Sequence, residues 1–158
     1  MVPTKTLACW KAFIEGMEKH VFNVNLFAVS GRAEIARIKR GVARASALGW
    51  VVGKIPPHGS SESPDAGYLA GDDAVRRANL ESALVEGASL AWALRGGYGA
   101  ARLAPFDGLP LAACPVLGFS DVTTLLAAVH QAGGRAIHGP VLTSFGEADE
   151  GTVAALQA

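Results

Sequence analysis

Three apolar segments of this chain each run directly into a turn that contains glycine. The turns are 30–31 (SG), 95–99 (RGGYG) and 118–121 (GFSD), and stretches with helical spacing of apolar residues separate them. Strands that alternate with helices form parallel sheets with right-handed crossovers. In an open parallel sheet, ligands bind beyond the carboxyl ends of the strands. The three turns are therefore predicted to meet at one ligand-binding edge.

The predicted fold is a three-layer α/β domain, an open parallel sheet with helices on both faces. In the first helix, Ile35, Ile38, Val42 and Ala45 recur every three or four residues and form one apolar face. Gly49 stands where a C-cap glycine belongs. Strands are predicted at 23–30, 50–55, 89–94, 115–118 and 135–137, and helices at 33–49, 72–86, 122–132 and 150–158.

A long loop separates the second predicted strand from the second helix. Residues 56–71 are rich in Pro, Gly and Ser, and sixteen residues without regular structure are unusual in a compact domain. Such loops are commonly functional or mobile. Asp72 follows the loop and is predicted to be the N-cap of the next helix, because its carboxylate can accept a hydrogen bond from a free backbone amide.

Composition and charge exclude several classes of protein. Half of the 158 residues are hydrophobic, enough to build a core, so the chain is not intrinsically disordered. Fourteen basic residues balance fourteen acidic ones, so no positive field favours a nucleic acid or an anionic membrane as partner. Cys9 and Cys114 are too few for a disulfide framework and predict reduced thiols in a cytoplasmic protein. No His, Cys and Asp cluster has metal-ligand spacing, and no cofactor is expected.

Residues 1–22 are predicted to be an extension that precedes a single domain at 23–158. Apolar residues at helical spacing predict a short amphipathic helix there, and interspersed charges exclude the apolar core of a signal peptide. We expect this helix to pack on the domain or on a partner chain rather than on a membrane, because its polar face carries mixed charge. The apolar residues are Trp10, Phe13, Ile14, Met17 and Val21.

One glycine turn invites comparison with dinucleotide-binding proteins. Residues 97–102 (GYGAAR) begin like G-x-G-x-x-G, but Arg102 occupies the third glycine position, where it would obstruct helix–strand packing. No acidic residue ends a strand about twenty residues later, as ribose binding would require. A small nucleotide-binding domain is therefore a minor alternative.

The third turn has two interpretations. Ser120 lies between an apolar strand and a helix, where a sharp strand-to-helix elbow exposes a nucleophilic hydroxyl beside a backbone N–H that stabilises an oxyanion. Position 122 is Val, so the G-x-S-x-G pattern is only half met. Alternatively, Ser120 caps the helix. Spacing alone favours the cap.

Seven segments, taken in order, resemble the LD-carboxypeptidase family of S66 serine peptidases. The resemblance covers the chain from about residue 24 to its end and departs from the family at Val29, where a proline is usual. It implies a peptidase that releases terminal D-alanine from murein tetrapeptide in the cytoplasm, during cell-wall recycling. The segments are AVSG, ALGW, GYLAGDD, RRANLESAL, LRGGYGAARL, LGFSDVTTLL and HGPVLTSFGE.

The same resemblance assigns roles to individual residues. It implies that Ser120 is the nucleophile and that the Asp121 amide, with one from Gly96 or Gly97, forms the oxyanion hole. The family's triad is completed by a Glu and a His from a second, C-terminal domain. The last predicted helix has no stop signal, and we expect the chain to end before that domain and to be inactive alone.

Other residues near the predicted edge have two readings each. Arg95 would bind a substrate carboxylate bidentately or hold loop carbonyls. The Asp121 carboxylate would contact substrate or serve as an N-terminal helix charge. Tyr68 and Tyr98 would line the cleft or pack against it. His138 follows the fifth strand near the same edge, and its family counterpart in HGP is not the base, so we interpret it as structural.

The function expected from the resemblance is that of a serine carboxypeptidase half. Its partner would be a small murein-like peptide, and family members form homodimers, so either a second copy or the missing C-terminal half is an expected protein partner. The alternative from another class is a non-catalytic peptide-binding or assembly module derived from the same family.

Overall fold

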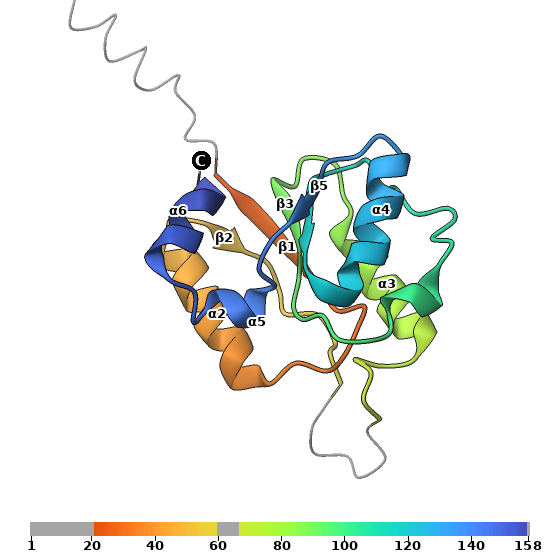
Figure 1. Ribbon diagram of the computed structural model, residues 1–158, viewed down its shortest axis with the longest axis horizontal. Helices are drawn as coiled ribbons and strands as arrows, with labels where there is room; N and C mark the ends of the chain where they lie inside the picture. Colours follow the sequence, from red (N-terminus) through yellow and green to blue (C-terminus); the bar gives the residue numbers. More distant parts are fainter. Residues whose placement is uncertain (1–20, 60–66, 158) are drawn as a thin grey trace, which may run out of the picture.

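Five parallel strands form one sheet at the centre of the chain (Figure 1). The computed structural model describes residues 21–59 and 67–157. The strand order is β2-β1-β3-β4-β5, so β1, β3 and β4 are neighbours in the interior of the sheet and β2 and β5 form its edges. This confirms the predicted parallel α/β architecture. The strands are β1 Asn23–Phe27, β2 Val51–Val52, β3 Leu90–Ala93, β4 Val116–Gly118 and β5 Ala136–His138.

Helices cover both faces of the sheet (Figure 1). In β3, Leu90 and Trp92 pack into the core beneath α2, α5 and α6, whereas Ala91 and Ala93 pack into the core beneath α3 and α4. This alternation is what a strand buried on both faces requires. The helices are α2 Ile35–Ala47, α3 Asp73–Ala83, α4 Thr123–Gln131, α5 Leu142–Phe145 and α6 Glu150–Gln157.

An aromatic cluster fixes the segment after β5 against the sheet. The fully buried Trp92 ring lies 5.0 Å from Phe145 and 5.9 Å from Trp50, in edge-on contacts. Its Nε1 donates a 2.7 Å hydrogen bond to the Pro140 carbonyl. Such rings bury a large apolar area, and each fully buried side chain contributes about 1.5–3 kcal/mol. The chain between β5 and α5 is therefore held over the carboxyl half of the sheet.

The strands and helices occur where the sequence predicts them, with shorter bounds except for β5. This strand is shifted by one residue and includes His138, which was expected to follow it. Ile35 and Val75 were expected on buried faces but are 45% and 38% exposed, because both lie in the first turn of their helices. Gly49 has a φ of +83° directly after the helix C-cap, as expected, and the Asp72 side chain accepts the Val75 amide as N-cap.

Three short elements were not predicted. They are the 3-10 turns η1 Ala100–Leu103 and η2 Ser120–Val122 and the four-residue helix α5. None is long enough to show a hydrophobic period. The expected N-terminal helix lies outside the described residues, apart from Val21 and Phe22, which are not helical. Val21 is 52% exposed, and the Phe22 ring lies 4.9 Å from that of Trp50. Cys114 is a buried free thiol, as expected, and Cys9 lies outside the described residues.

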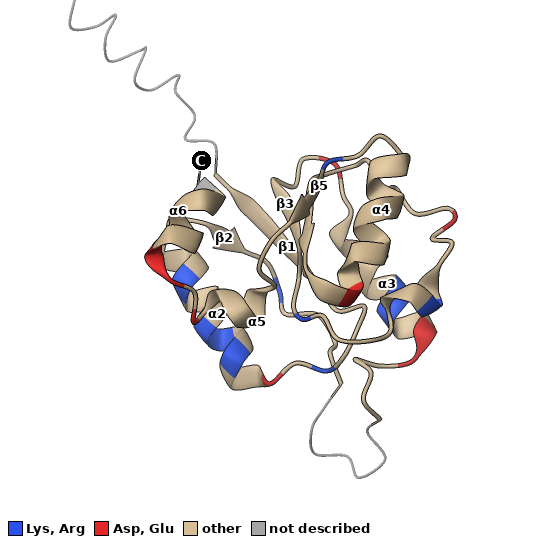
Figure 2. Cartoon of the chain, in the orientation of Figure 1, with Lys and Arg blue, Asp and Glu red and all other residues tan. Residues whose placement is uncertain are grey.

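The basic side chains of α2 pair with acidic residues that follow α5. Figure 2 shows the basic and acidic positions on these neighbouring segments. Arg37 and Arg40 lie 3.5 and 3.0 Å from Glu147, and Arg44 lies 3.2 Å from Glu150. Exposed pairs of this kind contribute about 0–1 kcal/mol each. They place an acidic partner beside most of the basic residues of this helix. None of the helices in the described part of the chain has the length and apolar character to cross a membrane.

Candidate active site

The three glycine turns meet at the carboxyl edge of the sheet. They follow the adjacent strands β1, β3 and β4. Residues 94 and 27 are joined by a 2.9 Å hydrogen bond from the Leu94 amide to the Phe27 carbonyl, which sets the first two turns side by side. The third turn reaches the second through a close contact between Ser120 and Gly96. The predicted convergence is thus present in the structure.

Ser120 has a strained backbone and an exposed side chain. Its φ is +62°, one of two left-handed non-glycine residues among those described, and it begins η2 directly after β4. A left-handed φ costs a non-glycine residue roughly 1–2 kcal/mol. The N-cap residues of η2 and α4 are Phe119 and Val122, so the interpretation of Ser120 as a helix cap is wrong. The geometry is that of an elbow that presents the hydroxyl outward.

Gly96 packs directly against this elbow. A Cβ at position 96 would lie 2.9 Å from the Phe119 carbonyl oxygen and 2.9 Å from the Ser120 Cβ. No side chain fits there without moving backbone. Gly97 and Gly99 have φ values of +115° and +132°, which strongly favour glycine. The glycines therefore let the RGGYG turn bring its backbone against the nucleophile candidate.

The Asp121 carboxylate points into the protein. Its Oδ2 accepts a 2.7 Å hydrogen bond from the Ser30 hydroxyl and another of 2.7 Å from the Ala100 amide. Ser30 is fully buried. The side chain thus joins all three turns, which neither of its two predicted roles included.

Arg76 is a buried arginine that joins two of the turns and was not among the predicted site residues. Its guanidinium is fully buried and donates to the Val29 carbonyl and, at 2.7 Å, to the Gly99 carbonyl. A second nitrogen contacts Asp73 at 2.5 Å. The available signal was spacing, because Arg76 precedes Leu80 by four residues and shares its buried face. This arginine ties the first turn to the second from below.

Asp73 connects Arg76 to a surface arginine. Hydrogen bonds from Arg102 and then from Arg76 hold the pKa of the Asp73 carboxyl below its ordinary value. Asp73 in turn raises the pKa of the Arg102 guanidinium. Arg102 therefore lies in an ion-pair network rather than in a helix–strand contact. The preceding glycines open into η1 and not into an α-helix, which counts against a dinucleotide fingerprint.

Arg95 and Tyr68 pack together beside the turns. The Arg95 guanidinium donates a 2.6 Å hydrogen bond to the Arg32 carbonyl and lies 5.5 Å from the centre of the Tyr68 ring. The loop-carbonyl contact expected for Arg95 is therefore present. A Cβ at Gly31 would lie 2.9 Å from the Tyr68 ring, and one at Gly97 would collide with its hydroxyl. Tyr68 thus lies across two glycine turns.

Tyr98 lies in the second turn with 56% of its surface exposed, and it contacts the Arg102 side chain. Its ring is available to a ligand above the turn. A single exposed aromatic ring is common on protein surfaces, whereas several grouped rings are typical of binding surfaces. Phe119, 52% exposed, is a second exposed ring at the neighbouring turn. The edge of the sheet therefore presents apolar rings as well as polar backbone.

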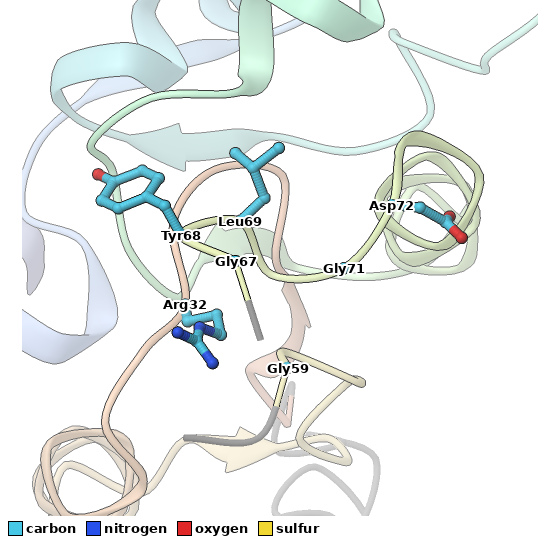
Figure 3. A pocket seen from close by; sticks show the side chains of 7 residues that line it. All are labelled: Arg32, Gly59, Gly67, Tyr68, Leu69, Gly71 and Asp72. Carbon is cyan, nitrogen blue, oxygen red and sulfur yellow. The ribbon is translucent and has the colours of Figure 1, made fainter. Parts of the chain in front are cut away.

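A pocket of about 420 Å³ borders the turns (Figure 3). Figure 3 shows the Arg32 side chain pointing into the space between Gly59 and Gly67, with the Tyr68 ring turned away from it. Ser120 is not part of its lining. The lining residues are Arg32, Gly59, Gly67, Tyr68, Leu69, Gly71 and Asp72.

None of the histidines in the described part of the chain hydrogen-bonds to the candidate nucleophile. Between described residues, no hydrogen bond joins the Ser120 hydroxyl to a histidine or a glutamate. The His138 ring packs on Phe119 at 5.1 Å, in agreement with a structural role. His58 bonds the Pro56 carbonyl at 2.9 Å. The described residues contain no cluster of three His, Cys, Asp or Glu suited to a metal ion.

Known proteins resemble this chain in sequence over half of its length and in fold over most of it. Over 84 residues the chain is 44% identical to the murein tetrapeptide carboxypeptidase of Pseudomonas aeruginosa, which covers 50% of this chain and 27% of that protein. The muramoyltetrapeptide carboxypeptidase of Oxalobacter formigenes superposes with a TM-score of 0.70 at 22% identity, covering 85% of this chain and 46% of that one.

The microcin C7 self immunity protein MccF, in complex with aspartyl sulfamoyl adenosine, gives a TM-score of 0.70 at 24% identity and covers 87% and 43% of the two chains. The chain thus matches less than half the length of each of these proteins. The family model of the S66 peptidases, described as the LD-carboxypeptidase N-terminal domain, matches residues 24–139. The chain therefore belongs to the LD-carboxypeptidase family, through that N-terminal domain.

Proposed function

We propose that this chain carries the nucleophile of a serine carboxypeptidase and that Ser120 is that nucleophile. The observation that carries the proposal is the geometry of the elbow. Ser120 is exposed, has a φ of +62°, does not cap a helix and packs against the glycine turn after β3. A structural serine has no need of this strain, whereas a nucleophile gains exposure from it.

The proposed reaction is acyl transfer through a covalent intermediate. The Ser120 oxygen attacks the carbonyl carbon of the terminal peptide bond while a base removes its proton. The negative oxygen of the tetrahedral intermediate is held by the Asp121 amide and by an amide of Gly96 or Gly97. The intermediate collapses to an acyl-enzyme as the leaving amine takes a proton, and water then releases the acyl group.

None of the described residues supplies a base that could take the proton of Ser120. A serine hydroxyl is a weak nucleophile until a neighbouring group takes its proton. The resemblance implies a Glu and a His from a second domain, and the relatives are more than twice as long as the part that this chain matches. We propose that these groups come from outside the domain at 24–139, and that the 158-residue chain alone has little or no activity.

The proposed substrate is a murein tetrapeptide, from which terminal D-alanine is released. This substrate is supported by the 44% identity, over 84 residues, to a murein tetrapeptide carboxypeptidase and by the fold shared with a muramoyltetrapeptide carboxypeptidase. Arg95 and Tyr98 are the proposed substrate contacts, since both side chains are exposed beside the elbow. The proposed setting is the cytoplasm, in cell-wall recycling, with a homodimer or a C-terminal half as protein partner.

The test is D-alanine release from tetrapeptide by the protein expressed from its own gene. We expect turnover by the wild type and its loss in Ser120→Ala, with Ser144→Ala as matched control because Ser144 is an exposed serine in α5. Equal turnover in Ser120→Ala and Ser144→Ala would refute the proposal. Tetrapeptide binding without turnover, unchanged in Ser120→Ala, would instead indicate a non-catalytic binding module.

A further inference from the structure

The Asp121 side chain lies next to the candidate nucleophile, but its contacts point away from it. Both of its hydrogen bonds, to the Ser30 hydroxyl and to the Ala100 amide, are 2.7 Å long. Distances this short are typical of bonds to an ionised carboxylate, which are about twice as strong as neutral ones. Ser30 has no exposed surface, so this end of the contact cannot belong to a substrate.

These contacts hold the glycine turn at one of its ends. Residues 96–100 run from a glycine packed on Ser120 to an amide bonded to Asp121. The turn is thus held twice by consecutive residues of the nucleophile elbow, once by packing and once by a charged hydrogen bond. The Ser30 hydroxyl, in the turn that follows β1, donates to the same carboxylate and so fixes the elbow relative to a second strand.

The other contacts of this turn restrain it against Arg76 and Tyr68 rather than against the elbow. Gly97 and Gly99 give it two glycines with positive φ, and glycine backbones have the largest conformational freedom of any residue. Arg76 bonds the Gly99 carbonyl from below, which restrains the far end but not the distance to the elbow. The Asp121 carboxylate is the described side chain that joins the turn to the elbow directly.

We propose that the Asp121 carboxylate is a positioning residue: it sets the distance between the glycine-turn amides and the Ser120 oxygen. This inference rests on the proposed function, in which those amides bind the oxyanion. Oxyanion donors act over about 0.3–0.5 Å of tolerance in donor distance, and a misplacement near 1 Å lowers rates roughly 100-fold. The carboxylate itself does not touch substrate.

The test compares Asp121→Ala, Asp121→Asn and Ser30→Ala. The amide oxygen of Asn can still accept both hydrogen bonds, Ala accepts neither, and Ser30→Ala removes one from the buried side. Asp149→Ala is the control, because Asp149 is an exposed carboxylate that accepts a 2.7 Å hydrogen bond from the Thr152 amide far from the elbow. Two readouts are taken: kcat and KM for tetrapeptide with the protein expressed from its own gene, and amide NMR spectra of the 158-residue chain.

Positioning predicts that Asp121→Ala lowers kcat at least tenfold with KM changed less than threefold, and that Asp121→Asn recovers most of the loss. In the spectra, the Ala100 amide loses exchange protection at least tenfold, and the Gly96 signal, which Asp121 does not touch, moves as well. Ser30→Ala gives smaller changes of the same kind and decides the question if Asp121→Ala does not fold.

Two results would overturn the inference. In one, the Gly96 signal of Asp121→Ala is the same as that of the wild type. In the other, Asp121→Asn and Asp121→Ala lose the same amount of activity and the loss is an increase in KM, as expected for a charge that contacts substrate. Absence of turnover in the wild type would refute the proposed function instead. The NMR comparison would then still decide whether Asp121 holds the turn.

Discussion

Replacing Gly96 by alanine tests the contact on which the site depends. The added Cβ would lie 2.9 Å from both the Phe119 carbonyl oxygen and the Ser120 Cβ, closer than real Cβ atoms approach other atoms. Both obstacles belong to the elbow, so the clash cannot be relieved by rotating a flexible side chain. The turn or the elbow must move by about 0.5 Å, since carbon atoms prefer separations of about 3.5–4 Å.

The expected magnitude follows from this displacement. Overpacking of a well-packed site costs about 1–3 kcal/mol, which corresponds to a decrease in Tm of roughly 2–12 °C for a chain of this size. Misplacing the oxyanion donors is expected to lower kcat by about 10–100-fold. Thermal unfolding followed by circular dichroism measures the first effect, and tetrapeptide turnover by the protein expressed from its own gene measures the second.

Gly151→Ala is the matched control for Gly96→Ala. Gly151 lies in α6, where a Cβ would meet its nearest atom at an ordinary 3.5 Å, and alanine in a helix is favoured over glycine by about 0.5–1 kcal/mol. The control should therefore keep or raise Tm. A Gly96→Ala protein with the Tm of the wild type would show that the glycine turn does not lie against Ser120, and the account of the site would be wrong.

Three further predictions concern stability. Arg76→Met should lower the free energy of unfolding in urea by about 3 kcal/mol or more, because two buried carbonyls lose their donor; a loss under 1 kcal/mol would contradict this role of Arg76. Folding lowers the pKa of Asp73, so its carboxylate stabilises the fold above the ordinary pKa of 3.8, and this contribution is lost as the pH falls below that value. Arg102→Gln should therefore make the free energy of unfolding depend less on pH in this range. An unchanged dependence would exclude the ion-pair network. Ser120→Gly should be more stable than Ser120→Ala by about 1 kcal/mol in thermal unfolding, since only glycine is unstrained at positive φ, and equal stabilities would argue against the elbow.

The sheet could be predicted from the sequence because its strands are distinct apolar runs. Residues 90–93 are buried on both faces and read as a continuous apolar stretch, and the glycines after each strand marked the edge where the turns meet. The helix α5 could not be predicted, since four residues cannot show a period of 3.6. Its position depends on Trp92 and Phe145, which contact each other only in the folded chain.

The candidate residues of the site could be named from the sequence, but the contacts between them could not. Ser120 was identified through its turn, but the choice between cap and elbow depended on a φ that the sequence does not encode locally. Asp121 finds its partners 91 and 21 residues away, in two other turns. The burial of Arg76 ran against the usual exposure of arginine and became intelligible only with the carbonyls that it binds.

Trapping the acyl-enzyme decides whether Ser120 is the nucleophile. Murein tetrapeptide is mixed with the protein expressed from its own gene, the reaction is stopped with acid, and the digest is examined by mass spectrometry. The account predicts the tripeptide acyl group on the fragment that contains Ser120, and neither adduct nor D-alanine release in Ser120→Ala. Undiminished D-alanine release by Ser120→Ala, or an acyl group on a different residue, would contradict it.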